Sequence, residues 1–327
     1  MGYSKRVIVF GSTGTIGTKL IEILSSEHPD WHILAATRDV SRTSRLAKMG
    51  LPNVTMIQAD PLKKLDVLEV TKTCDIIFSC IGFHRYERSY WAKHWPPLMA
   101  SLLEATGSNK KLVFYDNLYA FGPTIDINPT TKVLPASNKS KPEIQAQLHK
   151  MIEEHMDKYP GTVAVIGGSD IFGPYAQKTL LGEAIIEKIV KDEPPIAFGS
   201  STVVHDFCFA HDLARAMALA ADQDRAYGKF WVCPHSIHHK TVREISNDVA
   251  IMAGKRAPVD VRVMDKVSCY LLSPFDRVMG EMIEMMPYWS NEYRVDESDF
   301  VREFGLKATP YEQALRETVD FYMRQAE

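Results

Sequence analysis

Short apolar runs alternate with helical patterns along the first half of the chain. The runs are continuous, as expected for strands that are covered on both faces. Between two of them, Leu20, Ile21 and Leu24 would share one side of a helix. Strands that alternate with helices in this way predict an α/β fold with a doubly wound parallel sheet. The expected strands lie at 6–10, 31–37, 54–60, 74–83, 111–116 and 162–168, and further helices at about 62–71, 89–106 and 143–159.

The pattern loosens after Gly173-Pro174, where apolar runs become shorter. We therefore expect a larger domain over residues 1–172 and a smaller substrate-binding region over 173–327. The smaller region should pack on the carboxyl edge of the sheet, where ligands of such sheets bind. A last helix, expected over about 309–325, opens with Thr309-Pro310, a capping residue followed by a first-turn proline.

Composition excludes some classes of protein. The chain has 327 residues, of which 45% are hydrophobic and 24% charged, as in globular proteins. A formal net charge of −3 argues against a nucleic-acid partner. No apolar leader or membrane-length run is visible, and the five cysteines form no Cys-x-x-Cys pair. These features predict a cytoplasmic monomer or homodimer with reduced thiols and no membrane partner.

A glycine-rich loop, "GSTGTIG", joins the first expected strand to the first helix. Gly11, Gly14 and Gly17 would let the backbone turn tightly and approach a pyrophosphate at the helix N-terminus. The alternative is a strand-to-helix turn without a ligand. We favour dinucleotide binding because the motif lies between a strand and a helix. The loop also supplies Thr13, Thr15 and Ile16.

The end of the second strand indicates which dinucleotide would bind. NAD sites place an acidic residue there, whereas this chain has Thr37-Arg38, followed by Arg42 and Arg45. A guanidinium suits a 2′-phosphate, which predicts NADP, with NAD less favoured. The acidic Asp39 favours NAD instead. The alternative to both is a solvated charged loop with no role in cofactor choice. Asp60, which ends the third strand, could accept a hydrogen bond from the adenine amino group or could be a turn residue.

These segments resemble the extended short-chain dehydrogenase/reductase superfamily, in its NAD-dependent epimerase/dehydratase branch. The likeness includes "VIVFGSTGTIG", "DIIFSCIG", "LVFYDNLYAFGP" and "GGSDIFGP", and it covers nearly the whole chain. It implies a Rossmann domain that holds NAD(P) and a smaller substrate domain. It also implies that Cys80, Ile81 and Gly82 line the cofactor, and that Ile171 and Phe172 lie against the nicotinamide.

The chain departs from this resemblance at the fifth helix. Family enzymes carry Tyr-x-x-x-Lys there, and this chain contains no such pair. Lys139 or Lys141 falls near the tyrosine position, and Glu143 or Gln145 near the lysine position. The sequence does not settle the register between the two.

Polar residues at the end of the fifth strand could compensate. Asp116 and Asn117 stand where the family has paired serines, and Tyr119 stands at the position of a threonine. Tyr119 could donate the missing proton, assisted by Asn117 and by the charge of Lys139 or Lys141. The alternative is that Tyr119 packs under the loop and Asn117 caps a turn.

Histidines elsewhere offer further candidates. His84 follows the fourth strand in an aromatic segment, "IGFHRYERSYWAKHWPP", and could be an acid or base, although a surface or packing role is more common. The His-Asp pairs at 205–206 and 211–212 are expected to be structural. "PHSIHH" (234–239) predicts an exposed loop and no metal site.

We expect an NAD(P)-dependent oxidoreductase that transfers a hydride to or from a small organic carbonyl compound or alcohol. One alternative is an epimerase, isomerase or dehydratase with no net redox change. Another is an inactive NADP-binding sensor, which the missing tyrosine would explain. The sequence names no substrate.

Overall fold

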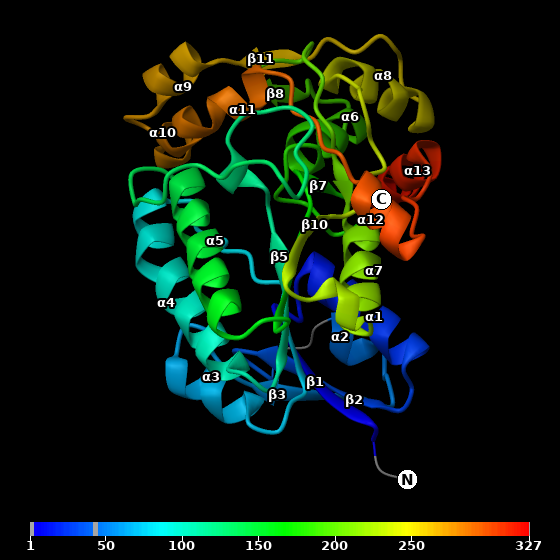
Figure 1. Cartoon of the computed structure of the whole chain (residues 1–327). Coiled ribbons are helices and arrows are strands. Elements are labelled where there is room, and N and C mark those ends of the chain that lie inside the picture. Colours follow the sequence, from blue (N-terminus) through cyan, green and yellow to red (C-terminus); the bar gives the residue numbers. More distant parts are fainter. Residues whose placement is uncertain (1–2, 42–44, 327) are drawn as a thin grey trace. The chain divides into compact units, whose positions relative to one another are not determined.

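A seven-stranded sheet forms the centre of the fold in the computed structural model, which describes residues 3–41 and 45–326 (Figure 1). The strand order is β10-β6-β5-β4-β1-β2-β3, and each pairing from β3 to β6 is parallel. This order reverses beside β1, which confirms the predicted doubly wound α/β fold. The strands are β1 (Lys5–Phe10), β2 (Trp31–Thr37), β3 (Val54–Gln58), β4 (Ile76–Ser79), β5 (Lys111–Asp116), β6 (Val163–Gly167) and β10 (Lys229–Val232).

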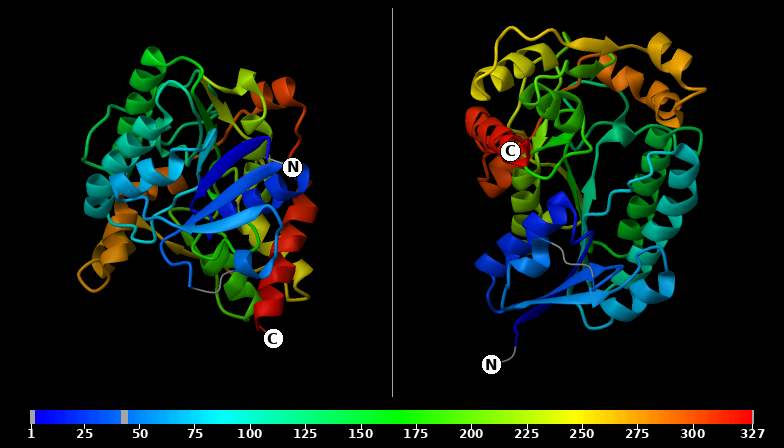
Figure 2. Two further views of the ribbon diagram at one scale, coloured as in Figure 1. Left: turned by 90° about the horizontal axis from the view of Figure 1, so that it is seen from below. Right: turned by 180° about the vertical axis from the view of Figure 1, so that it is seen from behind.

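Helices cover both faces of this sheet, which is why its central strands are mostly apolar. Figures 1 and 2 show α3 (Lys64–Thr71), α4 (Arg88–Thr106) and α5 (Lys141–Lys158) on one face. The opposite face carries α1 (Thr15–Glu27) and α7 (Ala210–Ala221), and the short α2 (Arg45–Lys48) precedes β3. Residues 7–10 of β1 are completely buried as a result.

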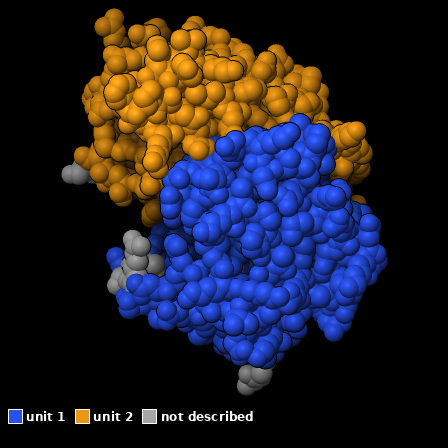
Figure 3. Space-filling model, turned by 90° about the vertical axis from the view of Figure 1, so that its left-hand side faces the viewer, with its two compact units in different colours: residues 1–116, 133–167, 213–231 blue, residues 117–132, 168–212, 232–327 orange. Residues whose placement is uncertain are grey.

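The chain divides into two compact units that interleave along the sequence (Figure 3). The sheet unit contains residues 1–116, 133–167 and 213–231, and the second unit contains residues 117–132, 168–212 and 232–327. A single boundary after residue 172 does not describe this arrangement, because residues 213–231 return to the sheet as most of α7 and β10.

Two small parallel sheets and a group of helices make up the second unit. β7 (Ile171–Phe172) pairs with β9 (Cys208–Phe209), and β8 (Ile196–Phe198) pairs with β11 (Arg262–Met264). The last helix begins at Tyr311, and Thr309 donates its backbone N–H and its hydroxyl to Asp212 instead of capping a helix at 309. The helices are a π-helix (Gly182–Glu187), α6 (Lys188–Val190), α8 (Val242–Met252), α9 (Lys266–Leu272), α10 (Arg277–Met282), α11 (Met286–Ser290), α12 (Ser298–Phe304) and α13 (Tyr311–Ala326), with short 3-10 turns at Tyr119–Phe121 and Ile283–Met285. A further 3-10 turn, Asp224–Ala226, belongs to the sheet unit.

Helices that cross a bilayer must be both long and apolar. None in the described part of the chain combines enough length with enough apolar character to cross a membrane.

Candidate active site

Backbone packing requires glycine at two positions of the loop between β1 and α1. Gly11 has a φ of +79°, and a Cβ atom there would lie 2.5 Å from the carbonyl oxygen of Cys80. A Cβ atom on Gly17 would lie 2.2 Å from the carbonyl oxygen of Gly11. A side chain fits at neither position without backbone movement, so these glycines let β1, β4 and α1 approach one another closely.

The N-terminus of α1 is suited to an anion. Gly14 occupies its N-cap position, no side chain among the described residues caps it, and its first turn contains no acidic residue. Thr13 and Gly14 are exposed, whereas Ile16 is buried beneath the loop and Thr15 is half-buried. The positive end of the helix dipole therefore faces a helix start without a side-chain cap. These features fit the pyrophosphate of a dinucleotide.

The segment after β4 lies beside this loop, because β4 is the neighbour of β1. The N–H of Cys80 donates to the carbonyl oxygen of Phe10 over 2.9 Å. Burial raises the pKa of the Cys80 thiol, and Ile81 is buried too, so both side chains pack rather than react. Gly82 is exposed, and a Cβ atom there would meet no described heavy atom within 4 Å. The backbone at Gly82 therefore leaves space above the sheet edge.

Arg38 is the basic group available at the end of β2. Its side chain is exposed and forms no ion pair with any described residue. Asp39 is the acidic residue that would favour NAD. Its Oδ1 accepts hydrogen bonds from the backbone N–H of Ser41 over 2.9 Å and from the Ser41 hydroxyl over 2.6 Å. Arg42 lies outside the described residues, and Arg45 is the first residue of α2. Asp60 accepts from the N–H of Leu62 through Oδ1, as a turn residue does, and Oδ2 has no described hydrogen-bond donor.

Burial distinguishes the two lysines at the start of the fifth helix. Lys141 is its first residue and is completely buried, as is Gln145 one turn later, whereas Lys139 is exposed. Lys141 and Gln145 therefore share one inward-facing line of α5. The Lys141 ammonium lies 4.5 Å from the centre of the Tyr86 ring, in a cation–π contact.

The same line of α5 continues to His149, which sequence analysis overlooked. Its Nε2 lies 3.2 Å from Oδ2 of Asp116, the buried last residue of β5. Burial alone would lower the pKa of His149, but the charge and hydrogen bond of Asp116 and the charge of Glu153 together raise it. The spacing of 141, 145 and 149 along one helix face is the signal that could have identified this histidine.

Tyr119 lies just beyond the carboxyl end of β5, in a strained turn. Leu118 is a buried, non-glycine residue with a φ of +63°, a conformation that is rare for leucine. Asn117 accepts the backbone N–H of Tyr119 through Oδ1 over 3.1 Å. The amide thus caps a turn, as the structural alternative expected, and this bond helps to fix Tyr119.

The hydroxyl of Tyr119 donates to Oδ1 of Asp170 over 3.0 Å. Oδ2 of the same carboxylate accepts from Nε2 of His205 over 2.9 Å and from Nε1 of Trp289 over 3.2 Å. His205 is 3% exposed, and its ring stacks on Tyr293. Asp170, His205 and Trp289 come from distant parts of the second unit, and sequence analysis assigned none of them to the site.

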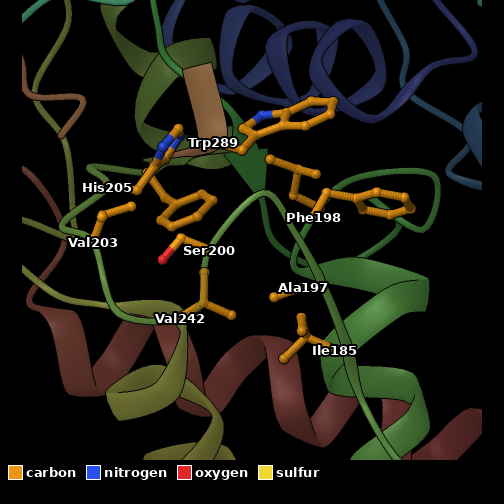
Figure 4. A pocket seen from close by; sticks show the side chains of 10 residues that line it. Ile185, Ala197, Phe198, Ser200, Val203, His205, Val242 and Trp289 are labelled. Carbon is orange, nitrogen blue, oxygen red and sulfur yellow. The ribbon is translucent and has the colours of Figure 1, made fainter. Parts of the chain in front are cut away.

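A small pocket lies behind this cluster in the second unit (Figure 4). Its volume of about 20 Å³ suits one water-sized group. In Figure 4, His205 and Trp289 lie on one side of the pocket and Val242 and Ile185 on the other. The pocket therefore has room for one water molecule beside His205 but is too small for an organic substrate.

The remaining predicted site residues are dispersed. His84 is exposed and makes no hydrogen bond with any residue that the structure describes. Phe83 occupies the centre of the aromatic segment instead, with its ring 4.6 Å from Trp95. Phe172 is buried in the core of the second unit against Phe209, and Ile171 is half-buried.

The histidine-rich segment 234–239 is not an exposed loop, so that prediction was wrong. His235 is buried, and both of its ring nitrogens have partners there. Nδ1 donates to the carbonyl oxygen of Cys233 over 2.7 Å, and Nε2 accepts the N–H of Ser169 over 3.0 Å. His238 bonds to both Asp206 and Glu297; burial opposes its charge, but these carboxylates raise its pKa to about 10. His235 also lies near two buried thiols, yet both of its ring nitrogens already have partners.

Comparisons with other proteins identify the family. Residues 7–233 match the sequence profile described as the NAD dependent epimerase/dehydratase family. A comparison with curated protein sequences finds no match.

Solved structures share the fold at low sequence identity. A dTDP-glucose 4,6-dehydratase from Bacillus anthracis, in complex with NAD, is 17% identical, with a TM-score of 0.79 over 98% of this chain and 97% of that chain. A UDP-glucuronic acid 4-epimerase from Bacillus cereus, in complex with NAD, is 14% identical, with a TM-score of 0.75 over 98% and 100%. A UDP-N-acetylglucosamine 4-epimerase from Methanobrevibacter ruminantium M1 is 18% identical, with a TM-score of 0.75 over 99% and 100%. With the profile match over most of its length, the chain belongs to the NAD dependent epimerase/dehydratase family.

Proposed function

We propose that the protein is a nicotinamide-dependent epimerase or dehydratase, which oxidises a hydroxyl group of a small organic substrate transiently and ends without net redox change. Family membership supports this reaction class over the net reductase that the sequence first suggested. The observation that carries the proposal is the glycine loop, which leads into an uncapped helix N-terminus free of acidic residues.

The residues of the sheet unit have distinct roles in holding the cofactor. The N-terminus of α1 would bind the pyrophosphate through the helix dipole and backbone N–H groups of its first turn. Oδ2 of Asp60 would accept from the adenine amino group, and Gly82 would leave room for the ribose and nicotinamide. When bound, the nicotinamide supplies a hydride acceptor and donor at C4 of its ring.

NADP is the dinucleotide that we propose. Arg38 is exposed without an ion-pair partner among the described residues, and Oδ1 of Asp39 is held by Ser41. A guanidinium in that position suits a 2′-phosphate. The solved dehydratase and epimerase named above were crystallised with NAD, but at 17% and 14% identity their likeness concerns the fold. Arg38 is the observation that supports NADP in this chain.

Tyr119 and Asp170 are the proposed proton-transfer pair. The Tyr119 oxygen donates its hydrogen to Asp170 and can also accept one, because a phenol oxygen has both capacities. A substrate hydroxyl that donates to Tyr119 could lose its proton as the phenolic proton moves to Oδ1 of Asp170. The reverse transfer would return the proton to a reduced product. His205 and Trp289 hold Oδ2 and so orient the carboxylate.

Lys141 is the third group that we assign to the reaction. A fully buried ammonium is costly to the fold unless it is well compensated. Its place at the start of α5, where the family has its phenol, favours a chemical role. We assign it the stabilisation of negative charge on a substrate or cofactor oxygen.

A turnover screen tests this proposal. The purified protein is incubated with catalytic amounts of NADP⁺ or NAD⁺ and a panel of sugar nucleotides and small hydroxylated metabolites, and products are identified by mass spectrometry and chromatography. We expect an isomer, or a product lacking one water, without accumulation of reduced nicotinamide. Stoichiometric consumption of NADPH by a carbonyl compound would instead make the protein a reductase.

A further inference from the structure

Three aromatic residues in α11 and just after it contact the turn that carries Tyr119, or its partner Asp170. Tyr288, Trp289 and Tyr293 lie within six residues of sequence, and each has an O–H or N–H group on its ring. All three are buried, so these polar groups need acceptors inside the protein. Like Tyr119 and Asp170, they belong to the second unit. We call the three residues the aromatic clamp.

The two phenols of the clamp donate to the backbone of the turn. The Tyr288 hydroxyl donates to the carbonyl oxygen of Tyr119 over 2.7 Å, and the Tyr293 hydroxyl donates to that of Leu118 over 3.3 Å. The same two oxygens also accept backbone N–H groups from within the turn, over 3.2 Å each. A carbonyl oxygen has two lone pairs, so each of these acceptors has a partner inside the turn and a partner in the clamp.

Leu118 shows why the turn requires such contacts. Its φ of +63° is unfavourable for a residue with a Cβ atom, and this conformation persists only where the surrounding structure holds it. A relaxed Leu118 would redirect the next residue and move the Tyr119 hydroxyl away from Oδ1 of Asp170, to which it now donates over 3.0 Å. The clamp bonds to the carbonyl groups of Leu118 itself and of Tyr119, which is where the backbone would have to rotate.

The clamp contacts the acceptor of the proposed proton transfer as well. Nε1 of Trp289 donates to Oδ2 of Asp170 over 3.2 Å. His205, which also contacts that oxygen, stacks on Tyr293 with the ring centres 5.0 Å apart. One short segment therefore holds both the turn that carries the phenol and the carboxylate that receives its hydrogen bond.

We propose that Tyr288 and Tyr293 are positioning residues, which hold the left-handed turn so that the Tyr119 hydroxyl meets Asp170. If the two residues only filled the core of the second unit, their rings would suffice and their hydroxyls could be removed without effect on the turn. The consequence for catalysis rests on the proposed function, whereas the consequence for the turn does not.

Hydrogen exchange tests the effect on the turn without a substrate. Tyr288→Phe and Tyr293→Phe each remove a hydroxyl and keep the ring, so both variants should fold. NMR or mass spectrometry measures exchange of the Phe121 and Gly122 amides, which donate to the two carbonyl oxygens. We expect this exchange to be about 3- to 10-fold faster in each variant than in the wild type, the effect of losing one neutral hydrogen bond.

Tyr311→Phe is the matched control for exchange. The Tyr311 hydroxyl donates to Oδ2 of Asp248 over 2.6 Å, between α13 and α8 of the same unit. This variant therefore loses a phenol hydrogen bond that does not involve the clamp, and exchange at 121 and 122 should match the wild type.

Turnover of a substrate found by the screen provides the second readout. Tyr288→Phe should lower kcat by about 10-fold, because a small displacement of a reacting group is costly. KM and dinucleotide affinity should be unchanged, since no binding group is altered. In a Tyr119→Phe background the same substitution should lower kcat no further, because the hydroxyl that Tyr288 positions is absent.

Unchanged exchange at 121 and 122 in both variants would overturn the proposal. An equal loss of kcat in the Tyr119→Phe background would also overturn it, since Tyr288 would then act on another part of the protein. Faster exchange, combined with no turnover by the wild type, would refute the proposed function and support the hold of the clamp on the turn.

Discussion

Tyr119 and Asp170 form the hydrogen bond on which the proposed proton transfer depends. Tyr119→Phe removes only the hydroxyl, so the fold and dinucleotide affinity should be retained. Turnover of a substrate found by the screen should fall by about 10²–10⁴-fold, the usual size of a general acid–base effect. Asp170→Asn should lower turnover similarly, because an amide cannot take up the proton. Steady-state kinetics of both variants measure this effect, with His84→Ala as a control that should retain activity.

Arg38 is predicted to select the 2′-phosphate of NADP. Arg38→Ala should weaken NADPH binding by about 1–3 kcal/mol, as expected for a charge-assisted hydrogen bond, and leave NADH binding nearly unchanged. Fluorescence titration with both dinucleotides gives the two affinities. Tighter binding of NADH than of NADPH by the wild type would show that the cofactor is NAD.

Sequence patterns identified single residues unevenly. Gly11 and Gly17 were recognisable because close backbone packing in a strand-to-helix loop requires glycine there. Asp170 and His205 were not, because their hydrogen bonds join segments 35 residues apart in sequence. Lys141 could be separated from Lys139 only by burial, which differs between two lysines of similar sequence context.

The loop that joins β1 to α1 allows its structural and ligand-binding roles to be separated. Gly17→Ala should lower the free energy of unfolding by about 1–3 kcal/mol even without a dinucleotide, because its Cβ atom would collide with the Gly11 carbonyl oxygen. Gly82→Ala should change it by less than about 0.5 kcal/mol, since the space there is open, yet should weaken dinucleotide binding. Urea unfolding and dinucleotide titration of both variants test this separation. Equal loss of stability in the two variants would contradict it.

The contact between α5 and β5 should make stability depend on pH. Asp116 raises the pKa of His149 above 6.5, so the pair stabilises the fold fully below pH 6.5 and loses this contribution as pH rises through the folded-state pKa. His149→Gln should therefore cost about 3 kcal/mol at pH 6 and less at pH 9. Urea unfolding at the two pH values gives the difference between wild type and variant.

His155→Gln, on the same helix, is the matched control for this pH effect. Burial lowers the pKa of His155, so its replacement should not show a cost that declines with rising pH. A cost of His149→Gln that stays constant, or that grows toward pH 9, would show that Asp116 does not stabilise the charged imidazole.

The elements of the sheet were predictable where burial on both faces demands continuous apolar runs. The strands expected at 31–37 and 111–116 have the observed bounds, and the expected helix at 143–159 begins two residues earlier, after the Ser140 cap. β10 was not identified as a sheet strand, because its four residues include an exposed lysine and lack a long apolar run. β10 joins the sheet because residues 213–231 return to the sheet unit, and this return depends on the whole fold.

The chain has the family's fold, and its sequence lacks the Tyr-x-x-x-Lys pattern that the resemblance led us to expect. Its profile match spans residues 7–233, while its sequence contains no Tyr-x-x-x-Lys. An enzyme with other acid–base residues and a sensor that catalyses no reaction would both bind the dinucleotide at this site. Each function proposed for this chain therefore requires that the chain bind the dinucleotide.

Calorimetric titration of the purified wild type and of Gly14→Val with NADP⁺ and NAD⁺ measures this binding directly. We expect the wild type to bind one NADP⁺ per chain, more tightly than NAD⁺. Gly14→Val should remain folded but bind neither, because its side chain would block approach of the pyrophosphate to the N-terminus of α1. Absence of binding to the wild type, or equal affinity of Gly14→Val, would show that this loop is not a dinucleotide site.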